Sequence, residues 1–329
     1  MALNLVSDWR FCYELTHFFL AAPQPVFLSR VGGSDTTAIV DYLHTKTGNT
    51  GRTLQDVHAT HLPIVEKFNG YYDKGKSIDK FFNYCELLSR LYLTSDNLFF
   101  CNNQLLSICF KDNINEAFYV EDFPYKPAYL DFISRLSAGG TTINCYPYNF
   151  VENIVSDEWT LFRVFSDVLP GKKVLVISAF SESITQNFHN RHSFFKNYDY
   201  PDFSLLVYNT PITYANLPDE FYPDQDWFQT LERMKADIAK LDFDVALLSC
   251  GSYGLALGDY IQRQLKRNAV YIGGVLQLYF GIMGRRYENP FFTSQINMDS
   301  FIYPVERDKF LKHVAITAQT PREAFGAYF

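Results

Sequence analysis

The sequence predicts an α/β fold: a Rossmann-like parallel sheet flanked by helices, with a largely helical insertion in the N-terminal half. Three observations lead to this prediction. Apolar runs of strand length recur along the chain, and glycine-containing turns follow several of them. Segments with helical periodicity come next, which is the order expected of βαβ crossovers in a parallel sheet. Hydrophobic residues make up 47% of the 329 residues, enough for a sizeable core.

The first strand, turn and helix unit lies near the N-terminus. Val26–Arg30 is typical of a short strand, and Thr36–His44 is typical of a helix. The turn between them contains Gly32, Gly33, Ser34 and Asp35. Residues 45–148 show helical patches, notably Ile78–Leu91, and are expected to form a mostly helical insertion or subdomain. We therefore expect one Rossmann-like domain over residues 1–329, with 45–148 inserted in it.

The signals for strands and helices are stronger in the middle of the chain. Val174–Ser178 is a continuous apolar run of the kind found in strands buried on both faces. Ser181–Ser183 offers N-cap side chains for a helix that continues to about Phe195. A further strand is expected at Asp202–Tyr208, and the apolar spacing within Asp226–Leu241 predicts an amphipathic helix.

Two further units follow one another directly in the segment 244–286. The first has a strand at Val245–Leu248 and a helix at Leu255–Lys266, and the second has a strand at Ala269–Ile272 and a helix at Val275–Met283. The turns and the residues after them contain Gly251, Ser252, Tyr253, Gly254, Gly273, Gly274, Gln277, Arg285 and Arg286. Adjacent turns of this kind place backbone N–H groups and helix N-termini on one edge of a parallel sheet, where phosphate groups bind. The segment predicts a nucleotide or nucleotide-sugar site.

Each of these turns has alternative interpretations. The turn at 250–254 could bind a ligand, could serve packing alone, or could be a nucleophile elbow with Ser252 at its centre. The elbow fits poorly, because Cys250 stands at the first glycine position and His313 is the only downstream histidine. Asp35 could act as a general base or metal ligand, or Ser34 or Asp35 could cap the following helix. The two arginines could hold a diphosphate or could be solvated surface charges.

Composition narrows the class of partner. The net charge is −7 and no Lys/Arg block occurs, so neither nucleic acid nor a polybasic contact with a membrane is expected. The six cysteines form no C-x-x-C pair, which is typical of reduced thiols in a cytoplasmic protein. The uncharged stretch 268–284 is too short and too rich in glycine for a transmembrane segment. The expected partner is a small molecule or a glycan.

Three segments together resemble bacterial glycosyltransferases of the GT-D fold, which occur with capsule and surface-polysaccharide enzymes. The segments are Leu28–Asp35, Pro170–Ile177 and Asp244–Arg286. The last is the most specific, because its two glycine turns, Gln277 and the arginine pair match in order. The resemblance implies transfer of a sugar from a nucleotide-sugar donor, with a UDP-sugar favoured, to a glycan or lipid-linked acceptor in surface polysaccharide synthesis. Such an acceptor is compatible with a peripheral position at a membrane.

The resemblance also implies roles for individual residues. Better-known members carry a metal-binding acidic pair in an R-x-G-D-x-E turn, and here Gly33 stands at the first acid and Asp35 at the second. Dependence on a divalent cation, Mn²⁺ or Mg²⁺, is therefore left open. Asp35 is expected to be the base of an inverting reaction, with Glu182 as the second candidate. Arg30, with Arg285 or Arg286, is expected to offset the charge of the leaving diphosphate.

Two other functions stay open at this stage. One is a non-catalytic nucleotide- or glycan-binding protein of the same fold, which the missing acid at Gly33 keeps in view. The other is a serine hydrolase that uses Ser252.

Overall fold

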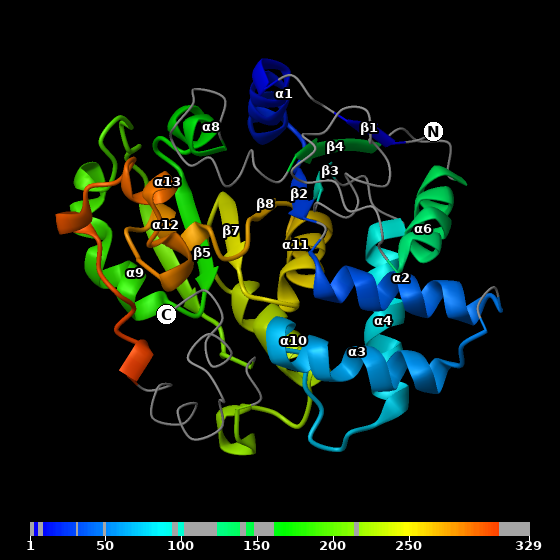
Figure 1. Ribbon diagram of the computed structural model, residues 1–329. Coiled ribbons are helices and arrows are strands. Elements are labelled where there is room, and N and C mark those ends of the chain that lie inside the picture. Colours follow the sequence, from blue (N-terminus) through cyan, green and yellow to red (C-terminus); the bar gives the residue numbers. More distant parts are fainter. Residues whose placement is uncertain are drawn as a thin grey trace.

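The chain folds around one twisted sheet with helices on both sides (Figure 1). The computed structural model describes residues 3–5, 9–30, 32–48, 51–93, 98–101, 124–138, 143–147, 161–213 and 217–308. All eight strands are parallel, in the order β1-β4-β3-β2-β8-β7-β5-β6. The strands are β1 (Leu3–Leu5), β2 (Phe27–Arg30), β3 (Leu98–Cys101), β4 (Ile143–Pro147), β5 (Lys173–Ser178), β6 (Ser204–Asn209), β7 (Val245–Ser249) and β8 (Asn268–Tyr271). The predicted α/β fold with a parallel sheet is confirmed.

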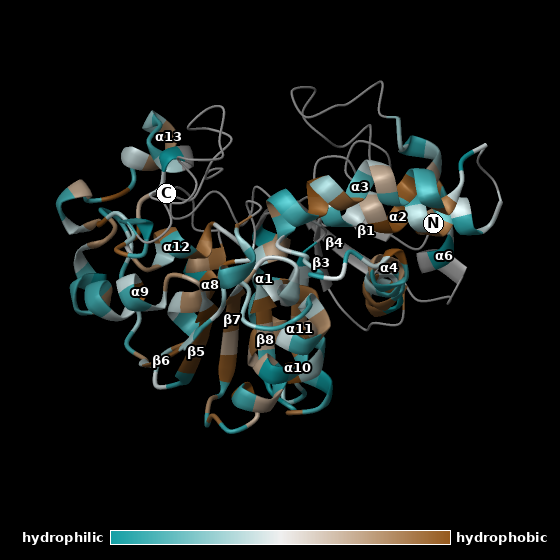
Figure 2. Ribbon diagram, turned by 90° about the horizontal axis from the view of Figure 1, so that it is seen from below, coloured by the Kyte–Doolittle hydropathy of each residue, from teal (hydrophilic) through white to brown (hydrophobic). Residues whose placement is uncertain are grey.

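Side chains of the central strands alternate between two separate cores, because successive residues of a strand point to opposite faces. In β5, Leu175 and Ile177 belong to one core, whereas Val174 and Val176 belong to the other. Figure 2 shows β7 as a hydrophobic strand between helices that carry hydrophilic residues outward. Burial on both faces explains why these strands are apolar without interruption.

The helices divide between the two faces accordingly. The first core is covered by α2 (Ser34–Lys46), α3 (Leu54–Asn69), α4 (Ile78–Leu93), α6 (Lys126–Ala138), α10 (Trp227–Ile238) and α11 (Tyr253–Arg263). The second core is covered by α1 (Trp9–Ala21), α8 (Leu161–Val168), α9 (Ser181–Asn187) and α12 (Leu276–Tyr279). Short elements complete the C-terminal part: 3-10 helices at Phe188–Ser193, Asp219–Phe221, Arg285–Tyr287 and Met298–Ser300, and α13 (Pro290–Thr293). Among the described residues, no helix has the length and apolar character needed to cross a bilayer.

The strand order reverses between β5 and β7. From β5 the chain passes through α9 to β6 on one side, whereas from β7 it passes through α11 to β8 on the other side. Because α9 and α11 cover opposite faces, the segments after β5 and β7 diverge. Open α/β sheets form their ligand crevice at such a reversal, at the carboxyl ends of the strands.

The region expected to be a mostly helical insertion contains α3, α4 and α6, and it also contributes β3 and β4 to the sheet. These strands pair with one another, and β3 also pairs with β2. The region therefore extends the sheet on the far side of β2.

The helix predicted at Val275–Met283 is wrong in length, since α12 ends at Tyr279. Gly281 adopts a left-handed conformation, with a φ of 68°, and turns the chain away. The Nδ2 of Asn187 donates to the carbonyl oxygen of Gly281 over 2.9 Å. A Cβ on Gly281 would lie 2.4 Å from the Phe194 ring, so contacts distant in sequence fix this turn.

The helix predicted to run to about Phe195 is also shorter than expected. It ends at Asn187 and continues as a 3-10 helix. No side chain at its N-cap, Phe180, accepts a hydrogen bond. Instead, the Glu306 carboxylate accepts from the N–H groups of Glu182 and Ser183, over 2.9 and 3.1 Å. The cap therefore comes from a residue far along the chain rather than from the local serines.

Candidate functional site

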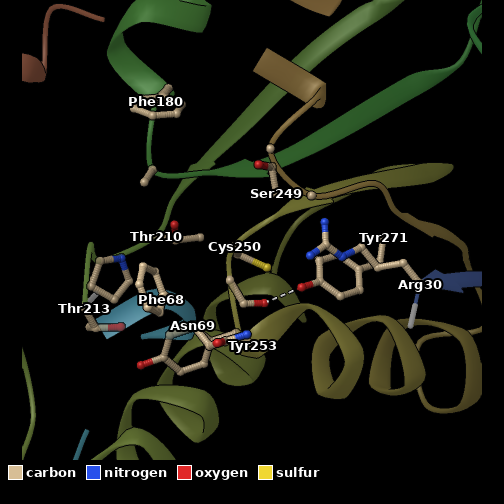
Figure 3. Close-up of a pocket in the computed structure, with 15 residues that line it drawn as sticks. Arg30, Phe68, Asn69, Phe180, Thr210, Thr213, Ser249, Cys250, Tyr253 and Tyr271 are labelled. Atoms are coloured by element: carbon tan, nitrogen blue, oxygen red, sulfur yellow. Dashed lines mark hydrogen bonds between the residues drawn. The ribbon is translucent and has the colours of Figure 1, made fainter. Parts of the chain in front are cut away.

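A pocket opens at the carboxyl edge of the sheet, at the reversal of strand order (Figure 3). The empty space at this place amounts to about 690 Å³, a figure that includes open solvent at the mouth of the pocket. Its walls come from the ends of β2, β5, β6, β7 and β8 and from the end of α3. The residues that line it are Arg30, Phe68, Asn69, Ala179, Phe180, Thr210, Pro211, Thr213, Ser249, Cys250, Gly251, Tyr253, Tyr271, Gly273 and Gly274.

One end of the pocket is cationic. Arg30 is the last residue of β2, and its guanidinium carbon lies 5.3 Å from the centroid of the Tyr271 ring. Gly273 makes this position possible, because a Cβ there would lie 2.1 Å from the Arg30 Nη1. Gly273 also has a φ of 79°, which favours glycine. The glycine after β8 therefore provides the space in which a cation from β2 is held.

The Tyr271 ring lines this end of the pocket and is held in place by a hydrogen bond and by packing. Its hydroxyl donates to the carbonyl oxygen of Gly251 over 2.7 Å (Figure 3). Burial raises the pKa of Tyr271 well above its ordinary value, although the charge of Arg30 opposes this, so the phenol remains a donor. Gly254 lies against the ring, where a Cβ would come within 2.3 Å of it. The structure therefore places Gly254 as a packing residue beneath Tyr271.

Asp35 lies in the first turn of α2 and interacts with two residues that line the pocket, Arg30 and Asn69. A Cβ on Gly32 would fall 2.3 Å from the Asp35 Oδ1, so the carboxylate packs directly against the Gly32 backbone. The Thr36 N–H donates to Asp35 Oδ1 over 2.9 Å. Burial raises the pKa of Asp35 from its ordinary value, while the Arg30 charge and hydrogen bonds, including one from Asn69, oppose the rise. Asp35 does not itself line the pocket, but Arg30 and Asn69 both do.

Asn69 joins the two turns of the site, and sequence reasoning missed it. Its backbone carbonyl accepts from the Ser252 N–H over 2.8 Å, and its Oδ1 accepts from the Ser34 hydroxyl. A Cβ on Gly251 would lie 2.7 Å from the same carbonyl. Gly70, with a φ of 84°, ends α3 and turns the chain here. The Asn69–Gly70 pair signals a helix end, but nothing local indicates that it meets the turn after β7.

The turn at 250–254 binds its own N–H groups internally. The N–H of Tyr253 donates to Cys250 O and that of Gly254 to Gly251 O. The Ser252 side chain is 2% exposed, and its oxygen accepts from the Trp227 Nε1 over 2.7 Å. Ser252 therefore faces the core beside Trp227 and does not line the pocket. His313, the histidine that a hydrolase would use, lies outside the described residues.

The remaining predicted residues lie in different places. Gln277 is buried, and its Nε2 donates to the Ile282 carbonyl at 3.5 Å, within the turn that follows α12. Glu182 is exposed on α9, where its Oε1 accepts from Gln186. Arg285 is exposed at the start of a 3-10 helix. None of these three lines the pocket. The side chain of Arg286 is outside the described part of the chain.

The donor set at the β2 turn does not match an acidic pair that holds a divalent metal. Gly33 has no side chain, the Ser34 hydroxyl is bonded to Asn69, and Asp35 is the one carboxylate of this turn. Nowhere in the described ranges do three histidine, cysteine, aspartate or glutamate residues gather as metal ligands would. The cation that the structure does provide at this place is the guanidinium of Arg30.

Comparisons with known proteins give little to add. No family model matches the chain, and no curated protein does. A search of solved structures finds the selenomethionine-substituted structure of domain of unknown function 1792 (DUF1792), with a TM-score of 0.44 and 14% sequence identity. That match covers 85% of this chain and 80% of the other. At this level of similarity, a function has to be inferred from the geometry of the chain itself.

Proposed function

We propose that the chain is a glycosyltransferase that transfers a sugar from a nucleotide-sugar donor, a UDP-sugar in the first instance, to a glycan or lipid-linked acceptor. One observation carries the proposal most directly. Arg30 is seated against Tyr271 and Gly273 at one end of the pocket on the carboxyl edge of the sheet, where an anionic ligand would bind. The residue-level resemblance of the β2 turn and of segment 244–286 to GT-D glycosyltransferases supports the same class. Surface polysaccharide synthesis in the cytoplasm is the setting that this resemblance suggests.

The reaction needs a group that receives charge and a group that receives a proton. The acceptor hydroxyl oxygen forms a bond to the anomeric carbon as the bond from that carbon to the phosphate oxygen breaks. The electron pair leaves with the nucleoside diphosphate, and the Arg30 guanidinium offsets the charge that develops there. We assign the proton to Asp35, the carboxylate of the β2 turn, and because Asp35 does not line the pocket, the proton transfer runs through a water molecule. Burial raises the pKa of Asp35 from its ordinary value, which favours uptake of the proton. With one base and direct attack, the transfer inverts the anomeric configuration.

The proposal assigns the diphosphate to a side chain rather than to backbone donors. The N–H groups of Ser252, Tyr253 and Gly254 all donate to protein carbonyls, and that of Gly273 donates to Leu248. They are therefore poorly placed to donate to a phosphate as well. This supports a central role for Arg30.

The test begins with a thermal-shift screen of the full chain against UDP-, GDP-, CMP- and dTDP-sugars, with and without Mn²⁺. We expect one nucleotide class to raise the melting temperature without added metal, and nucleotide release to follow when an acceptor is supplied. In the Asp35→Asn variant, turnover should fall by about 10²-fold or more, since a general base contributes about 10²–10⁴-fold, while nucleotide binding persists. Stabilisation by none of these sugars would refute the proposal.

A non-catalytic nucleotide- or glycan-binding protein is the second candidate. The observation in its favour is the single carboxylate at the β2 turn, where Gly33 replaces one acid of the pair. Under this alternative the wild type binds a nucleotide-sugar but forms no free nucleotide from it, with or without Mn²⁺, and Asp35→Asn has no turnover to lose. A serine hydrolase has less support, because the Ser252 hydroxyl is buried against Trp227. Labelling of Ser252 by a fluorophosphonate probe would support that function again.

A further inference from the structure

The pocket has a second end whose chemistry differs from that of the Arg30 end. Figure 3 shows Arg30 and Tyr271 on one side, and Phe180, Thr210 and Phe68 on the other. Thr213 is labelled on the same side as Phe68, and Pro211, which follows Thr210 in the chain, also lines the pocket. The two ends share one cavity, with Ser249 and Cys250 between them in the view of Figure 3.

Phe68 gives this end an open aromatic surface. It lies near the end of α3 and is 56% exposed, whereas most of the aromatic residues that the structure describes are buried or partly buried. The Lys67 ammonium lies 5.4 Å from the ring centroid. Phe180 forms a buried wall of the same pocket, and it is 5% exposed. The exposed Phe68 ring suits a planar ligand ring, because stacking on an aromatic side chain tolerates any base.

Thr210 adds a polar group among these apolar side chains. It is 3% exposed, and its hydroxyl has no hydrogen-bond partner among the residues that the structure describes. Its backbone N–H donates to Ser178 O over 3.2 Å, which holds the residue at the end of β6. The oxygen is enclosed, and buried hydroxyl groups are normally bonded, so a ligand that reaches this lining residue would supply the missing partner. A threonine hydroxyl can donate and accept, and so can meet the edge of a base.

We infer that the pocket binds a nucleoside diphosphate in one orientation, with the diphosphate at Arg30 and the base against the Phe68 ring, hydrogen-bonded to the Thr210 hydroxyl. This inference rests on the proposed function and assigns the orientation of the donor within it. The pocket has the Arg30 cation at one end and the exposed Phe68 ring at the other. A nucleoside diphosphate likewise has its charged phosphates at one end and its flat base at the other. A diphosphate at the other end would lie among Phe68, Phe180 and Pro211, and Lys67, the cation beside Phe68, does not line the pocket as Arg30 does.

The experiment measures dissociation constants of the full chain for UDP and for inorganic pyrophosphate by calorimetry. Pyrophosphate has the two phosphates but no base. Phe68→Ala should weaken UDP binding about tenfold, since stacking contributes about 1–3 kcal/mol per base. Thr210→Val keeps the shape of the side chain and should weaken UDP binding about fivefold, as expected for one neutral hydrogen bond. Neither variant should change the dissociation constant of pyrophosphate, whereas Arg30→Met should weaken both ligands.

Phe18→Ala is the matched control, because Phe18 is 62% exposed on α1 and does not line the pocket. It should leave UDP binding unchanged. The inference is overturned if the wild type binds UDP but Phe68→Ala and Thr210→Val leave its affinity unchanged, or weaken UDP and pyrophosphate equally. In those cases the proposed function survives with another orientation. Failure of the wild type to bind UDP or any other nucleotide of the screen removes the proposed function itself.

Discussion

The negative charge of the Asp35 carboxylate is destabilised by its buried surroundings. The carboxylate is buried, and burial raises its pKa more than Arg30 and its hydrogen bonds lower it. The folded chain therefore binds this proton more tightly than the unfolded chain does. Above the folded pKa, the ionised group lowers the free energy of unfolding; as the pH falls through the folded pKa toward the ordinary value, this cost disappears.

Because the pKa of Asp35 is raised in the folded chain, the free energy of unfolding should depend on pH. We expect the free energy of unfolding of the wild type, relative to that of Asp35→Asn, to rise as the pH is lowered from 8 toward 4.5. Denaturant titrations of both proteins at several pH values test this, because titrations common to both proteins cancel in the difference. A difference that falls over this range would mean that the carboxylate is stabilised in the folded chain, and Asp35 would then be a weak base.

Gly32 and Gly33, which precede the first turn of α2, differ in the space available for a side chain. A Cβ at Gly33 meets nothing within 4 Å, and its φ of −80° is open to any residue. A Cβ at Gly32 would fall 2.3 Å from the Asp35 carboxylate. Gly33→Ala should therefore change the free energy of unfolding by less than about 1 kcal/mol. Gly32→Ala should lower it by about 1–3 kcal/mol, as overpacking does.

Thermal and denaturant unfolding of the two alanine variants, each compared with the wild type, measure this contrast. Circular dichroism of both confirms whether the fold is kept. Equal losses at Gly32 and Gly33 would show that the turn is set by backbone freedom alone and not by the carboxylate behind Gly32.

Other elements show which local signals in a sequence can be trusted. The strands β5, β7 and β8 could be predicted because burial on both faces requires continuous apolar residues. The length of α12 could not, since Asn187 and Phe194 fix the turn at Gly281 from outside the segment. The cap of α9 could not either, because Glu306 supplies it from more than a hundred residues away. Local patterns describe elements well and describe their ends poorly wherever a distant side chain completes them.

At the scale of the whole molecule, strand order creates the site. Phe27 of β2 pairs with Ala269 of β8, so two strands far apart in the sequence lie side by side. The sequence predicts that both strands end at one edge of the sheet, and Arg30, Gly273 and Gly274 do meet in one pocket. It does not predict which strands are neighbours, because pairing depends on contacts between residues far apart in the chain. Asn69, Phe68 and Thr210 were missed for this reason.

This arrangement predicts that one ligand protects segments far apart in sequence. A nucleotide that bridges the pocket should stabilise the β2 turn and the turns after β7 and β8 together, because binding lowers the population of locally open states. In hydrogen exchange monitored by mass spectrometry, saturating UDP should slow exchange in peptides from residues 27–37, 249–254 and 272–276. Peptides around residues 266–268, at the opposite edge of the sheet, should exchange as in the free protein. Protection confined to residues 249–276 would place the ligand on the C-terminal half alone and leave Arg30 without its proposed role.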